Sequence, residues 1–349
     1  MTGSPHPGNK QFDQLTPFHL RAEVGDIVLE PEHEGQGYWV GAPGILYDLV
    51  ERCWWLTYRR RRPRGMYADV LGERGYLARV ARSTDGLHFD DVWEVRQDEW
   101  NTPSMERFSL VRDGDIYRLF VSYVDPADNR WRIDFLEADH PSRFEAASLH
   151  PALTADDVSH ASNEQVEGVK DPWVFRVGST WHMLISYAAR GLRTAHDAAI
   201  MHQTADVYNT GLITAPTGLG TSSDGRHWQW EGQILHTGGP GTWDRYQSRL
   251  NSLVPLAGFW LGFYDGSASH QENYEERCGL ATSTDLRHWT RLTSEQPAIV
   301  APHGTRSVRY VEAIRQVGTL HCYYEYARPN GSHDLRRLVV GIDEGWSLW

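Results

Sequence analysis

The sequence has few cysteines, no excess of positive charge and no long apolar run. Its three cysteines, Cys53, Cys278 and Cys322, lie in apolar, strand-like runs, which predicts buried thiols rather than a disulfide framework. A net charge of -12 argues against nucleic-acid and anionic-membrane partners, because clustered Lys and Arg bind these. No run approaches the ~18 apolar residues of a membrane span, and the N-terminus lacks the apolar region of a signal peptide. The expected location is therefore the cytoplasm.

Helical periodicity is also nearly absent, apart from possible short turns within 190–208. The chain instead repeats a unit in which an apolar run, a short turn and a strand ending in an aromatic residue follow one another. Gly and Asp between alternating apolar residues are typical of tight hairpin turns. The five strand endings are WWLTY, YRLFVSY, WHMLISY, FWLGFY and HCYYEY, closing at Tyr58, Tyr123, Tyr187, Tyr264 and Tyr326.

A second phrase follows these hairpins. It occurs as ARSTDGLHF (81–89), GTSSDGRHW (220–228) and ATSTDLRHW (281–289), with a degenerate copy, EADHPSRF, at 137–144. Five such units in one chain match radial repetition, which leaves only short sheet edges. We predict an all-β fold, a five-bladed β-propeller of four-stranded antiparallel blades.

The propeller is expected to occupy 1–349 as a single domain. The approximate blades are 38–98, 104–152, 168–236, 247–300 and 307–349. The last blade is one strand short, so we expect a strand near Val24 to Glu30, within the N-terminal segment 1–37, or the tail at Trp346 to Trp349 to complete it.

Polar residues at the starts of the innermost strands are the candidates for chemistry, because these strands converge on the axis. The carboxylates there are Glu106, Asp171 and Glu312. Carboxylates from different blades that face one cavity would suit glycoside hydrolysis, in which one protonates the leaving oxygen and another activates water or attacks. The alternative is structural, with each carboxylate tying down a loop or pairing with an arginine.

Other residues near the same strand starts are expected to bind substrate. These are Lys170, Arg249, Asn251, Arg309, Trp39 and Trp173. The histidines show no metal-ligand spacing, so we expect them to bind no metal, and we expect no cofactor. Whether the central channel holds a metal stays open. The basic run at 59–64 is interpreted as a solvated loop, with a local anion site as the alternative.

The repeated SxDGxHW phrases and the segment KDPWVFRVGSTWHMLISY resemble the five-bladed propeller glycosidases of families 43 and 32. The resemblance covers nearly the whole chain. It implies for Asp171 the role of the family 43 aspartate that tunes the pKa of the catalytic acid and orients the substrate. The family base would fall on Ala42 and its acid at Ser248 and Arg249, so these two carboxylates do not carry over.

The chain also resembles the mannoside phosphorylases of family 130, through Tyr58-Arg59 and Lys170-Asp171. That resemblance implies basic residues that hold phosphate, and it accounts for arginines near the axis.

Together these observations predict a glycoside hydrolase-like, carbohydrate-active enzyme that acts on a glycosidic bond of a small carbohydrate or sugar-like substrate in a central axial pocket. Two alternatives stay open: a non-catalytic sugar-binding or scaffold propeller, and a phosphorylase-like or repurposed non-hydrolytic enzyme. The sequence leaves open whether the chain is an enzyme, which sugar it takes and its oligomeric state.

Overall fold

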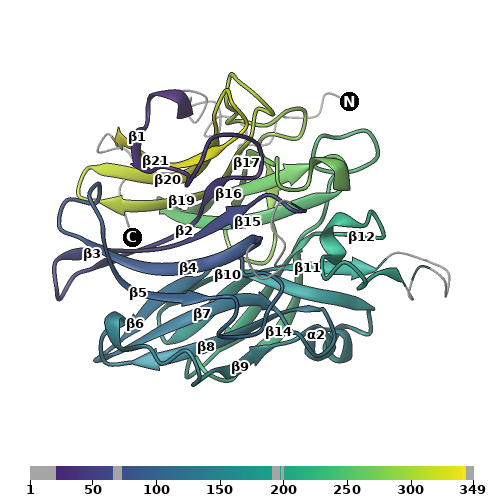
Figure 1. The fold of residues 1–349 in the computed structure, drawn as a ribbon, viewed down its shortest axis with the longest axis horizontal. Helices are drawn as coiled ribbons and strands as arrows, with labels where there is room; N and C mark the ends of the chain where they lie inside the picture. Colours follow the sequence, from purple (N-terminus) through teal and green to yellow (C-terminus); the bar gives the residue numbers. More distant parts are fainter. Residues whose placement is uncertain (1–20, 66–72, 191–196, 198–199, 343–349) are drawn as a thin grey trace, which may run out of the picture.

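The computed structural model describes residues 21–65, 73–190, 197 and 200–342. Within this part the chain is built from antiparallel sheets (Figure 1). Blade I contains β2 (Trp39–Asp48), β3 (Cys53–Arg62), β4 (Arg74–Ser83) and β5 (Asp90–Arg96). Blade II contains β6 (Ser109–Asp113), β7 (Ile116–Val124), β8 (Trp131–Ala138) and β9 (His150–Leu153).

The next two blades repeat this order. Blade III contains β10 (Val166–Val177), β11 (Thr180–Arg190), β13 (Thr217–Ser222) and β14 (Gln229–Leu235), with the short β12 (Ile213–Thr214) added to β11. Blade IV contains β15 (Gln247–Leu256), β16 (Phe259–Ser267), β17 (Arg277–Ser283) and β18 (Thr290–Arg291).

Blade V draws its outer strand from the other end of the chain. It contains β19 (Val308–Gln316), β20 (Thr319–Ala327) and β21 (His333–Gly341). The N-terminal strand β1 (Asp26–Leu29) pairs antiparallel with β21, with Asp26 opposite Arg337 (Figure 1). The missing strand therefore comes from the N-terminal stretch that the sequence indicated, and the alternative at Trp346 to Trp349 lies outside the described residues.

The innermost strands of the five blades lie next to one another. β2 contacts β6, β6 contacts β10, β10 contacts β15, β15 contacts β19, and β19 contacts β2. A parallel bridge between Trp39 and His333 also links blade I to blade V. The predicted fold class, a five-bladed propeller of four-stranded antiparallel blades, is confirmed. Apolar side chains fill the space between successive blades, as where Trp55 of blade I packs with Leu119 of blade II.

The repeated SxD phrases close the turns between the outer two strands of their blades. Asp85 accepts hydrogen bonds from the backbone N–H groups of Leu87 and His88, at 2.8 and 2.9 Å, and from His88 Nδ1 at 2.7 Å. Asp224 and Asp285 form the same three contacts in blades III and IV. The His-Asp pairs in these phrases are therefore exposed turn-forming groups.

The helical segments with defined bounds in the described part of the chain are short. They are η2 (Ala22–Val24), η4 (Pro141–Arg143), α2 (Ala155–Ser162), η5 (Val207–Asn209) and η6 (His270–Glu272). The sequence prediction missed α2, because two turns with only Ala155 and Val158 buried carry no visible period. A capping box between Thr154 and Asp157 begins this helix. Among the described helices none is long and apolar enough to cross a membrane.

The basic run forms part of a strand. Residues 59–62 lie in β3, where side chains alternate between two faces. Arg59 and Arg61 are buried on one face, while Arg60 and Arg62 are partly exposed on the other. The prediction of a solvated loop was therefore wrong for this segment, because a strand that enters the axis can bury every second arginine against carboxylates or aromatic rings.

Candidate functional site

The innermost strands share an irregularity near their starts. Register shifts occur between Gly41 and Gly44, between Lys170 and Trp173, and between Arg309 and Glu312. In each case two residues oppose one on the neighbouring strand, as in a β-bulge. The residue after the first of each pair has a left-handed backbone, with φ of 52° at Ala42, 57° at Asp171 and 53° at Tyr310. These three residues therefore hold equivalent places in blades I, III and V.

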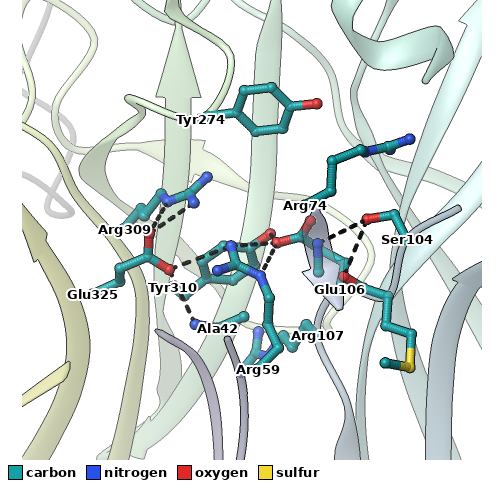
Figure 2. A network of polar contacts seen from close by, with 12 residues as sticks. Ala42, Arg59, Arg74, Ser104, Glu106, Arg107, Tyr274, Arg309, Tyr310 and Glu325 are labelled. Atoms are coloured by element: carbon teal, nitrogen blue, oxygen red, sulfur yellow. Dashed lines mark hydrogen bonds and ion pairs between the residues drawn. The ribbon is translucent and has the colours of Figure 1, made fainter. Parts of the chain in front are cut away.

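Glu106 and Asp171 meet at Tyr310. The Tyr310 hydroxyl donates toward Glu106 Oε1 at 3.0 Å (Figure 2). The same hydroxyl lies 3.4 Å from Asp171 Oδ1. Arg59 Nε donates to the same Glu106 oxygen at 2.7 Å. Two of the three carboxylates selected from the sequence are thus brought together by residues of blades I and V.

The cations selected from the sequence are paired with carboxylates of the chain itself. Arg249 donates to Asp171 and to Asp265, both at 2.6 Å. Lys170 Nζ lies 3.4 Å from Asp171 Oδ2. Arg309 binds Glu325 through Nε and Nη2, at 2.9 and 2.7 Å, and Glu276 through Nη1 at 2.9 Å. All of these groups are buried.

Several members of this network were not among the predicted catalytic and substrate-binding residues. They are Arg59, Asp265, Glu276, Tyr310 and Glu325. The prediction considered only the starts of the innermost strands, whereas Arg59, Asp265 and Glu325 lie on the second strands. The sequence did show a charged residue next to the aromatic residue that ends each of these strands. In the structure two of these charges pair across strands, since Asp265 lies opposite Arg249 and Glu325 lies opposite Arg309.

The place beside Ala42, where the resemblance would put a catalytic base, holds a carboxylate from another blade. Glu325 Oε2 accepts a hydrogen bond from the Ala42 backbone N–H at 3.2 Å (Figure 2). A Cβ atom on the preceding residue, Gly41, would lie 2.1 Å from the same oxygen. The absence of a side chain at Gly41 therefore makes room for the Glu325 carboxylate.

Replacing Gly41 with Ala is expected to destabilise the protein by about 1–3 kcal/mol, because Glu325 is fixed by Arg309 and His333 and the new methyl group overpacks the site. Urea denaturation measures the loss. The control is Gly341→Ala, at the end of β21, where the added Cβ meets no atom within 4 Å. Equal stability of the two variants would contradict the assigned packing.

Glu312 and Trp173 lie elsewhere. Trp173 Nε1 donates to Glu312 Oε1 at 2.7 Å, and the Arg107 guanidinium contacts the other oxygen. Both side chains line a cavity of about 820 Å³ that extends to Leu49 and Val317, in the hairpin turns at the far ends of the innermost strands. Neither Glu106 nor Asp171 lines this cavity.

The two remaining predicted substrate contacts are also buried. Trp39 stacks on His333 with ring centroids 4.4 Å apart, and the Arg309 guanidinium lies 5.1 Å from the Trp39 ring. The Asn251 backbone carbonyl accepts from Arg107 Nη1 at 2.7 Å. Neither polar atom of the Asn251 amide has a hydrogen-bond partner among the described residues.

Charge pairing decides the ionisation of the axial carboxylates. Burial by itself would raise the pKa of Glu106, but Arg59, Lys170 and Arg309 outweigh it and hold that pKa well below its usual range. Burial likewise opposes ionisation of Glu325, and Arg309, Arg59 and His333 lower its pKa well below the usual range. Both groups are therefore ionised at neutral pH.

Stability is expected to fall in acid. Glu106 and Glu325 have pKa values below the ordinary 4.5, so their contribution is complete above about pH 4.5 and is lost as the pH falls through their lowered pKa values. Urea midpoints measured between pH 7 and pH 3 check this. Glu325→Gln should flatten the decline, and a wild-type midpoint that does not change over the range would contradict the assignment.

Comparison with known proteins gives a likeness of structure only. No family model matches the sequence, and a search of curated proteins finds no relative. Among solved structures, a β-1,2-mannobiose phosphorylase from Listeria innocua is 16% identical, with a TM-score of 0.59 over 91% of this chain and 94% of its own. A glycoside hydrolase is 12% identical, with a TM-score of 0.66 over 96% of both chains. This chain has their fold.

The fold also matches a GH43_1 enzyme from Xanthomonas citri in complex with xylotriose, at 10% identity and a TM-score of 0.60 over 92% of both chains. The resemblance to five-bladed propeller glycosidases inferred from the sequence is therefore confirmed for the fold. At these identities the likeness does not extend to the reaction, which must be argued from the side chains of this chain.

Proposed function

We propose that this protein is a carbohydrate-active enzyme that acts on a glycosidic bond at the axial cluster around Glu106 and Asp171. One observation carries the proposal. Glu106 Oε1 is occupied by Arg59 and Tyr310, whereas its buried Oε2 has no hydrogen-bond partner among the described residues. An ionised carboxylate with one oxygen available can accept a proton from water or from a sugar hydroxyl.

The surrounding groups keep Glu106 ionised, which excludes it as the proton-donating acid and leaves it the role of a base. Its lowered pKa keeps it ionised at neutral pH. Burial, together with the Asp171 and Glu106 carboxylates, raises the pKa of Tyr310, so its hydroxyl stays protonated and keeps donating. Asp171, held by Lys170 and Arg249, fixes the other side of that hydroxyl. Asp171 is thus a positioning residue that holds Tyr310 and Glu106 in place.

A small carbohydrate is the proposed substrate. The similar structures named above include complexes with mannobiose and xylotriose, and the unpartnered Asn251 amide offers both a donor and an acceptor for a sugar hydroxyl. Glu312 contacts Arg107, whose backbone N–H lies 3.4 Å from Asp171 Oδ1. We assign Glu312 to positioning Arg107.

A panel of aryl and natural glycosides, assayed with and without inorganic phosphate, tests the proposal. Release of free sugar in both conditions indicates hydrolysis, and a sugar phosphate formed only with phosphate indicates phosphorolysis. The absence of any cleaved product over the panel would reject the enzyme assignment.

A non-catalytic sugar-binding propeller is the second candidate. It is favoured by the pairing of Glu106, Asp171, Asp265, Glu276 and Glu325 with cations within 4 Å. Such a mesh can be purely structural. Saturable binding of a sugar without turnover, measured by calorimetry, would select this candidate.

A further inference from the structure

Arg61 is a buried cation that lacks a carboxylate partner. Its side chain lies on the same face of β3 as Arg59, and the residue is 5% exposed. Among the described residues no carboxylate lies within 4 Å of its guanidinium, and Nη1 has no hydrogen-bond partner. Its recorded contacts are with aromatic rings, at 4.0 Å from the Tyr274 centroid and 5.0 Å from the Trp39 centroid.

Arg74 is a second buried arginine that has nitrogen atoms without hydrogen-bond partners among the described residues. It begins β4 with a φ of 55°, and Nη1 donates to the Ala205 carbonyl at 3.1 Å. That bond fixes the guanidinium, and Nε and Nη2 have no hydrogen-bond partner among the described residues. Nε and Nη2 form the edge through which an arginine binds both oxygens of a carboxylate or phosphate. The residue is 5% exposed, and the nearest carboxylate to this edge is that of Asp206, 3.7 Å from Nη2 and beyond hydrogen-bond distance.

Two of the arginines here share one carboxylate. Asp206 forms a close ion pair with Arg64, lies 3.7 Å from Arg74 Nη2 and accepts from the Tyr274 hydroxyl. Figure 2 shows Tyr274 and Arg74 above the axial cluster and Arg107 below it. We call Arg61, Arg64, Arg74, Asp206 and Tyr274 the basic cluster.

The electrostatics of the basic cluster differ from those of the axial pairs. Burial lowers the pKa of Arg61 to about 9 and that of Arg74 to about 10. Arg59, which is equally buried, has a raised pKa because Glu106 and Glu325 outweigh the effect of burial. A buried charge without a partner is costly, and a bound anion would relieve that cost.

We propose that Arg61 and the open edge of Arg74 bind a carboxylate carried by the sugar, so that this protein accepts uronic acids in preference to neutral sugars. The proposal deepens the function given above and rests on it, but binding can be measured without turnover. A carboxylate is planar and matches the Nε–Nη2 edge in a bidentate manner. The Glu106 carboxylate raises the pKa of both arginines and so partly opposes the effect of burial.

Calorimetric titration of the full chain with glucuronate, galacturonate, glucose and galactose tests this. A uronate should bind at least ~10-fold more tightly than the neutral sugar of the same configuration, and Arg61→Gln or Arg74→Gln should remove the difference. The matched control is Arg60→Gln, on the opposite face of the same strand, where the guanidinium donates to the Glu30 carbonyl. Equal affinity for acidic and neutral sugars, or an equal loss in the Arg60 variant, would overturn the proposal.

Two further measurements separate the possible failures. Inorganic phosphate and a sugar phosphate are titrated in parallel. If inorganic phosphate binds more tightly than the uronates and this binding depends on Arg61, the basic cluster binds a free anion, and the uronate proposal is rejected. Cleavage of neutral glycosides without a preference for acidic ones would reject the uronate and leave the proposed enzyme intact. Uronate binding without cleavage of any glycoside would reject the enzyme and support the uronate site.

A stability measurement distinguishes a binding role for Arg61 from a structural one. Because no carboxylate among the described residues pairs with its charge, Arg61→Met should raise the melting temperature while abolishing the preference for uronates. A lowered melting temperature in this variant would show that Arg61 is a structural cation and would overturn the proposal.

Discussion

Replacing Glu106 with Gln is expected to lower kcat by about 10²–10⁴-fold on any glycoside that the protein cleaves, the range typical of a lost general base. The amide cannot accept the proton through the position of Oε2, the oxygen that has no partner in the described structure. Steady-state kinetics measure kcat and KM separately, and KM is expected to change much less than kcat.

Glu325→Gln is the matched control for this result. Glu325 also lies on the axis and contacts Arg59, but both of its oxygens are occupied, Oε1 by Arg309 and His333 and Oε2 by the Ala42 N–H. This variant should lose stability and keep kcat within about tenfold of the wild type. An equal fall of kcat in both variants would mean that the charge network, and not Glu106 as base, limits the rate.

Replacing Arg249 with Met is expected to destabilise the protein by about 3–5 kcal/mol, because it leaves Asp171 and Asp265 buried without the cation that each contacts at 2.6 Å. The loss is read from the free energy of unfolding in urea. Arg226→Met is the control, since the Arg226–Glu137 pair lies at the surface and is worth at most about 1 kcal/mol. A loss as small as that of the control would show that the axial pairs do not hold the blades together.

Part of the candidate site was predictable because it follows from position along a strand. Glu106 lies just before the innermost strand β6 and Asp171 lies within the innermost strand β10, and strands that converge on an axis bring such residues together. Glu312 lies within the innermost strand β19, beyond the bulge that follows Arg309, and it lines the cavity at the other end. A bulge adds one residue to the register and leaves no mark in the pattern of apolar residues.

The partners in the network could not be predicted for a different reason. Arg59 meets Glu106 across 47 positions of sequence, and Tyr310 meets the same carboxylate across 204. No local pattern encodes such contacts. The run of arginines at 59–62 shows the limit most clearly, since composition indicates solvent whereas the strand buries Arg59 against carboxylates and Arg61 against aromatic rings.

The sequence by itself determined the blades, because hairpin turns and alternating apolar residues are local and repeat in every unit. It also determined that Lys170 and Asp171 lie in an innermost strand. Only the tertiary structure decided which charges form ion pairs and which do not. On the axis, buried charges from five blades meet at distances of 2.5–3.8 Å. At that range, and away from water, the pairing sets the ionisation of Glu106 and leaves Arg61 without a carboxylate.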